Sequence, residues 1–169
     1  MAIDFVQETS TVVERFARQG KLFVVSKRWA GVASGSSVDF VINNPADSGR
    51  DLYLLTIQIT GTDQAWIDMF VDSQGLGSGM ALSPANKYIG HSMTAKAVIE
   101  VDGSYTPGTK VHETVLPGGS GRFATGGSAE LGVGGIIPPG HNLHVRLTNK
   151  SANANDLSIR VVWWEKERG

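Results

Sequence analysis

Apolar and polar residues alternate along most of the chain with a period of two, the pattern of β-strands that bury one face. The alternation is clearest near the C-terminus, in the segment Leu143–Thr148 and again between Leu157 and Trp163. We expect one face of each of these strands to lie in the core and the other to face largely water. The residues predicted to share this core are Leu143, Val145, Leu147, Ile159, Val161 and Trp163.

Similar short runs, rich in Val, Ile, Leu, Thr and aromatic residues and separated by Gly, Pro, Asn and Ser, follow Lys21. No helical stretch separates them, which disfavours parallel βαβ winding. The sequence therefore predicts one all-β domain over residues 21–169, an antiparallel jelly-roll or β-sandwich of about eight strands. The predicted strands are Leu22–Lys27, Val38–Asn43, Leu52–Thr60, Ala65–Asp72, Tyr88–His91 (the weakest), Ala95–Val101, Thr109–Leu116, His141–Asn149 and Leu157–Glu165.

Residues 1–20 have a different pattern and are predicted to form an N-terminal helical arm. Thr11 and Glu14 have the spacing of a capping box, and Gly20 stands where a helix would end. We expect a short helix near residues 11–19, packed by its apolar stripe on the barrel or on a neighbouring subunit. The residues of this stripe are Val12, Val13 and Phe16.

The predicted strand at residues 65–72 is apolar on both faces. Ile67 and Met69 lie on one face, while Trp66 and Phe70 lie on the other. A loop or the N-terminal helix covers the second face, or another subunit does, since large aromatic residues are enriched at interfaces.

The last predicted strand contains two adjacent tryptophans, Trp163 and Trp164, which must point to opposite faces. One of them is expected in the core and the other at an interface. The candidate interface residues of the chain are therefore Trp66, Phe70, Trp164, Val12 and Phe16.

Residues 117–140 are the most glycine-dense part of the chain. They lack the Gly-Lys-Ser/Thr ending of a phosphate-binding loop and the strand–turn–helix setting of a dinucleotide fingerprint. We expect a surface loop at one end of the barrel, with a ligand-contacting loop as the alternative.

Composition excludes several classes of function. A formal net charge of -1 provides no overall field for nucleic acid or for an anionic membrane. The chain has no cysteine, which excludes disulfides, thiolate metal sites and thiol nucleophiles. The apolar runs are far shorter than the roughly 20 residues of a membrane-spanning helix, so direct membrane insertion is not expected.

No catalytic or metal site is predicted from the spacing of the polar residues. His141 and His144 would point to opposite faces of a strand, which makes them a poor metal pair. Asp68 and Asp72, or Glu100 and Asp102, could be imagined as a carboxylate pair for glycoside hydrolysis, but such pairs on strands are more often solvated acids. No serine stands in a Gly-x-Ser-x-Gly nucleophile elbow with a strand–turn–helix context, and Ser78, in the sequence Gly-Leu-Gly-Ser-Gly at residues 75–79, lies in a glycine run. We therefore expect a protein that is not an enzyme and needs no cofactor.

The C-terminal part of the chain carries a family resemblance. Residues 136–150 read Ile-Ile-Pro-Pro-Gly-His-Asn-Leu-His-Val-Arg-Leu-Thr-Asn-Lys, and a final strand ends in Trp-Trp-Glu at residues 163–165. This pattern resembles the closing strands of small phage virion proteins. The whole chain is similar to the single jelly-roll capsid proteins of tailless icosahedral phages, such as those infecting Thermus, and less so to head decoration proteins of tailed phages.

The resemblance implies a location in the virion, contacts with copies of the chain and with other virion proteins, and no cofactor. A glycan- or receptor-binding β-sandwich module of a phage tail or cell surface is the alternative function. Four tryptophans could supply the aromatic platform that sugar binding needs. An enzyme or a cellular protein of another role is the third class.

Overall fold

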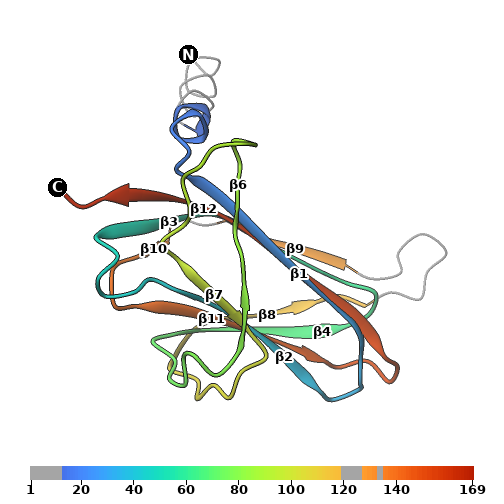
Figure 1. Cartoon of the computed structure of the whole chain (residues 1–169). Helices are drawn as coiled ribbons and strands as arrows, with labels where there is room; N and C mark the ends of the chain where they lie inside the picture. Colours follow the sequence, from blue (N-terminus) through green and yellow to red (C-terminus); the bar gives the residue numbers. More distant parts are fainter. Residues whose placement is uncertain (1–12, 119–126, 133–134) are drawn as a thin grey trace, which may run out of the picture.

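The computed structural model describes residues 13–118, 127–132 and 135–169. Two antiparallel β-sheets pack face to face, and one short helix precedes them in the chain (Figure 1). This architecture confirms the predicted all-β sandwich with a short N-terminal helix.

Sheet A has the strand order β10-β3-β12-β1-β6, and β9 also pairs with β3. Its strands are β1 (Leu22–Val32), β3 (Arg50–Gly61), β6 (Ala85–Asn86), β9 (Gly127–Gly132), β10 (Ile136–Ile137) and β12 (Asn155–Glu167). Sheet B has the order β5-β7-β2-β11-β4-β8. Its strands are β2 (Ser37–Asn43), β4 (Ala65–Val71), β5 (Met80–Leu82), β7 (Val98–Val101), β8 (Thr109–Leu116) and β11 (Asn142–Asn149).

The two sheets are wound as a jelly roll. Its four antiparallel pairs are β1 with β12, β2 with β11, β3 with β9, and β4 with β8. Each pair lies inside the previous one in sequence, and successive pairs alternate between sheets A and B. The chain is therefore arranged like one long hairpin wrapped around the core, which is the predicted topology.

The core lies between the inward faces of the two sheets. All six residues predicted from the C-terminal alternation are buried members of one hydrophobic cluster. Trp163 is fully buried, and its ring centre lies 6.0 Å from that of Phe23 on β1. The register of β11 and β12 therefore agrees with the prediction from period-two alternation.

The predicted strand at Tyr88–His91 is wrong. These residues form a turn, in which the His91 N–H donates a hydrogen bond to the Tyr88 carbonyl at 3.0 Å. Ile89 is 94% exposed, so this segment has no buried face to hold it against a sheet.

The glycine-dense segment 117–140 contains strands β9 and β10 rather than a continuous loop. Both strands pair with β3, and β9 completes the jelly roll. Glycine is a poor strand former, so the backbone hydrogen bonds to β3 outweigh the local preference. Residues 119–126 and 133–134 lie outside the described residues.

The N-terminal helix covers residues 13–18 in the structure, and Gly20 ends it as predicted. The Gly20 N–H bonds to the Ala17 carbonyl at 2.9 Å, and the Lys21 N–H bonds to the Phe16 carbonyl at 3.0 Å. This is a Schellman motif, which needs the left-handed φ of +68° that Gly20 adopts. The predicted cap at Thr11 lies outside the described residues.

Candidate functional site

Trp66 is the exposed aromatic residue among the interface candidates. It lies on the outer face of β4 with 48% of its surface exposed, and Val115 of β8 stands directly opposite with 53% exposed. The ammonium of Lys150 lies 3.9 Å from the centre of the Trp66 ring. We call these three residues the Trp66 surface, and it lies at the β8 edge of sheet B.

Phe70 lies on the same face of β4 as Trp66, but the chain itself covers it. Only 8% of Phe70 is exposed. Its ring centre lies 5.4 Å from that of His144, which in turn lies 5.4 Å from the ring centre of Tyr105. Phe70 is therefore covered from its own sheet, by His144 of β11 and by Lys110 of β8, whose ammonium lies 5.7 Å from the centre of the Phe70 ring. The exposed apolar surface of this face is therefore carried by Trp66.

Phe16 and Trp164 pack against each other on the outer face of sheet A. Their ring centres are 3.7 Å apart, and the ring centre of Tyr53 lies 4.3 Å from that of Trp164 on the same face. Both Phe16 and Trp164 are half-buried. The contact holds the N-terminal helix on its own barrel. The remaining candidate, Val12, lies outside the described residues.

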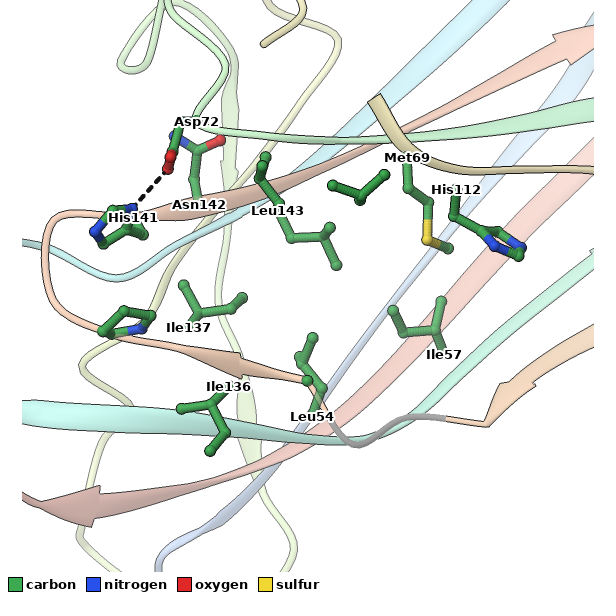
Figure 2. Close-up of a pocket in the computed structure, with 14 residues that line it drawn as sticks. Leu54, Ile57, Met69, Asp72, His112, Ile136, Ile137, His141, Asn142 and Leu143 are labelled. Atoms are coloured by element: carbon green, nitrogen blue, oxygen red, sulfur yellow. Dashed lines mark hydrogen bonds and ion pairs between the residues drawn. The ribbon is translucent and has the colours of Figure 1, made fainter. Parts of the chain in front are cut away.

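An apolar cleft of about 640 Å³ lies between the two sheets (Figure 2). Its walls come from β3 and β10 of sheet A and from β4, β8 and β11 of sheet B. Small-molecule sites in proteins typically have volumes of about 300–1,000 Å³ and mostly apolar walls. The main apolar lining residues are Leu54, Ile57, Met69, Ile136, Ile137 and Leu143.

Two polar side chains meet at one end of this cleft. Nδ1 of His141 lies 2.9 Å from Oδ1 of Asp72, and both side chains are about half exposed (Figure 2). Asp72 has a φ of 57°, a left-handed conformation that aspartate tolerates better than most residues. His141 follows a turn at Gly140, whose φ is +84°. These two turns bring the end of β4 and the start of β11 together.

Asp68 and Asp72, one of the carboxylate pairs considered in the sequence, do not meet. Asp68 lies on the outer face of β4 and forms an ion pair with Lys110 at 2.8 Å, whereas Asp72 bonds to His141 at the cleft. The two histidines also lie in different surroundings. His141 is half exposed at the cleft, whereas His144 is fully buried on the outer side of sheet B. Neither the two carboxylates nor the two histidines therefore form a joint site.

Sheet B contains a buried polar network that sequence reasoning missed. Ser73 Oγ lies 2.9 Å from His144 Nδ1, and His144 Nε2 lies 2.6 Å from Asp39 Oδ1. The Gly108 N–H donates to Ser73 Oγ at 3.0 Å. In the neutral tautomer whose Nε2–H donates to Asp39, the Nδ1 atom of His144 accepts the proton of the Ser73 hydroxyl.

This order of serine, histidine and aspartate is that of a catalytic triad, but the serine is enclosed. Ser73 is 1% exposed and His144 is fully buried, so a substrate in solution does not reach the hydroxyl oxygen. The network instead ties four segments of the chain together, β2, β11, the turn after β4 and the turn before β8. We interpret it as the support that holds the turns after β4 and before β8 against sheet B.

The carboxyl group of Asp39 is the charged end of this network. Burial alone would raise the pKa of Asp39, but the hydrogen bonds that it accepts from His144 and Arg146 outweigh burial and hold the pKa below its ordinary value. The Arg146 Nε–H donates to Asp39 at 2.8 Å. Asp39 therefore stabilises the folded state in its ionised form.

We expect the folded state to lose stability in acid as Asp39 becomes protonated. A lowered pKa gives stabilisation that is present above the ordinary aspartate pKa of about 3.9 and is lost as the pH falls through the folded-state value. Asp39→Asn should be less stable than the wild type at neutral pH and should lose less stability between about pH 4 and pH 2. Urea titrations at successive pH values measure both slopes. Parallel acid losses in the two proteins would contradict this role.

Among the described residues, no group of three or more His, Cys, Asp or Glu side chains is placed to hold a metal ion. Within the same part of the chain, the helix is too short to cross a membrane. No protein-family model and no curated protein sequence matches the chain. The function is therefore argued from the fold and the surfaces described above.

Proposed function

We propose that the chain is a virion structural protein, a capsid or capsid-decoration subunit that acts by binding copies of itself and other virion proteins. The observation that carries the proposal is the winding of the four strand pairs into a two-sheet jelly roll. Viral capsid and lectin domains share this architecture. The resemblance of the C-terminal strands to small phage virion proteins favours the capsid role.

The Trp66 surface supports assembly as the mode of action. A tryptophan with 48% of its surface exposed leaves a large apolar ring in contact with water. Tryptophan is enriched among the residues that dominate binding energy near the centre of an interface. Val115 extends the patch across β8, which is the last strand of sheet B and can be covered by a neighbouring subunit.

Replacing Trp66 with glutamate should therefore disrupt self-association without unfolding the chain. We expect the wild type to form oligomers in light scattering and sedimentation, and Trp66→Glu to be a monomer with the wild-type circular dichroism spectrum. A charge at the centre of an apolar interface opposes association, while a half-exposed position tolerates it in the monomer.

Val98→Glu is the matched control. Val98 is 43% exposed and lies on β7, near the opposite edge of sheet B. This variant should associate like the wild type. A wild-type chain that stays monomeric at high concentration, or a Val98→Glu variant that dissociates equally, would contradict assembly through the Trp66 surface. A monomer that binds glycans through Trp66 would favour the receptor-binding alternative.

A further inference from the structure

We infer that the apolar cleft is a binding site for a small amphipathic molecule with an alkyl chain and a head group that donates hydrogen bonds, an alcohol or a primary ammonium. The cleft lies between the sheets, on the inward side of β4, whereas the Trp66 surface lies on the outward side. Occupancy of the cleft is therefore independent of the proposed assembly surface.

The walls of the cleft select an apolar chain. Ile57 and Leu54 of sheet A face Met69 and Leu143 of sheet B across the space (Figure 2). Val71 of β4 lines the same cleft, packs against the core and is half-buried. An alkyl chain in the cleft would remove apolar surface of these side chains from water, at about 25 cal/mol for each Å² of apolar area.

The polar end of the cleft selects the head group. In its neutral form, the His141 imidazole donates from Nδ1 to Asp72 and keeps Nε2 as an acceptor. The Asp72 carboxylate also retains accepting capacity beyond this bond. The site thus presents acceptors and a negative charge. A hydroxyl or an ammonium can donate to these groups, whereas a carboxylate head would meet the like charge of Asp72.

The neighbouring polar side chain does not change this preference. The Asn142 amide nitrogen donates to the Ser73 carbonyl at 3.1 Å, and its amide oxygen accepts from the Ser73 N–H at 3.0 Å. Asn142 is therefore occupied in fixing the turn after β4. The selectivity of the head-group site rests on Asp72 and His141.

Three probes with the same chain separate these contributions: 1-octanol, octylammonium and octanoate. At pH 8 we expect octanol and octylammonium to bind saturably, and octanoate to bind about tenfold more weakly than octylammonium. Methyl spectra of the full chain labelled at methionine report the place of binding. Met69 lies in the cleft and should shift on binding, while the exposed Met80 on β5 should not.

Two variants test the two ends of the site. Asp72→Asn keeps an oxygen that accepts from His141 and removes the charge, so it should weaken octylammonium about threefold and leave octanol unchanged. Val71→Glu puts a charge in the cleft and should abolish octanol binding, while Val98→Glu should not alter it.

Several results would overturn the inference. One is a Met69 signal that stays unshifted with all three probes. Others are equal affinities for octanoate and octylammonium, or equal losses in Val71→Glu and Val98→Glu. Light scattering on the same samples keeps this test separate from assembly, because Trp66→Glu should retain the binding of octanol as a monomer.

Discussion

Replacing Trp163 with alanine should lower the free energy of unfolding by about 3–5 kcal/mol, the range for large aromatic side chains removed from a packed core. Trp163 is fully buried beside Phe23, and its indole N–H donates to Oε1 of Glu165 at 3.2 Å. The substitution therefore removes apolar contacts from both sheets and one buried hydrogen bond. Urea unfolding followed by circular dichroism measures the change.

Trp164→Ala is the internal control for this prediction. Trp164 is adjacent in sequence but points to the outer face, where Phe16 and Tyr53 cover it only in part. Trp164→Ala should lower the free energy of unfolding by less than Trp163→Ala does, since less apolar surface is lost from the core. A loss below about 1 kcal/mol for Trp163→Ala would show that the core is not built as described.

Replacing Glu165 with alanine should lower the free energy of unfolding by about 3–5 kcal/mol, as much as Trp163→Ala, because it breaks a buried ion pair. Glu165 is fully buried and accepts hydrogen bonds from the backbone N–H groups of Lys96 (2.9 Å) and Ala97 (3.1 Å). It also forms an ion pair with Arg50 at 3.1 Å. Removing the carboxylate leaves a largely buried guanidinium without its partner, and it takes the acceptor from three donors, the Lys96 and Ala97 N–H groups and the Trp163 indole N–H.

The same arginine provides the control, because it also meets Glu167 at 3.5 Å. The Glu167 side chain is 65% exposed, and exposed ion pairs contribute little to stability. Glu167→Ala should therefore change the free energy of unfolding by less than about 1 kcal/mol. Similar small losses in both variants would contradict the role of Glu165 as the buried partner of Arg50.

The fold could be predicted because alternation is a local signal. The alternation of neighbouring residues indicates the buried face of β11 and of β12. A shift of the register by one residue would expose Val145 and Trp163 together. The helix end at Gly20 was predictable for the same reason, since a left-handed residue leaves a recognisable signal at a single position.

The parts that could not be predicted depend on contacts between distant segments. Strand β9 forms in a glycine-rich sequence because β3 supplies its hydrogen bonds. Tyr88 and Ile89 are residue types that favour strands, but no neighbouring strand pairs with this segment and both side chains are exposed. In the same way, the buried polar network combines Asp39, Ser73 and His144 from three distant segments, and no local spacing in the sequence predicts that they meet.

The same distinction between local signals and contacts of distant segments applies to the candidate surfaces. The two-faced pattern of β4 was enough to single out Trp66, but Phe70 is covered by side chains from β8 and β11, which lie far away in the sequence. The cleft was invisible in the sequence, because its walls combine side chains from both sheets with the turn at Asp72. Volume and enclosure are properties of the assembled sheets and not of any one strand.

The nested pairing of the jelly roll also determines when the domain can form during synthesis. Because β1 pairs with β12, this pair can form only after nearly all of the later strands have left the ribosome. Pairing between segments so far apart in sequence makes folding slow and leaves unpaired strand edges exposed meanwhile. The inner pair, β4 with β8, closes a much shorter loop. A nascent chain should therefore nucleate there and close its barrel last, through the hydrogen bonds between β1 and β12.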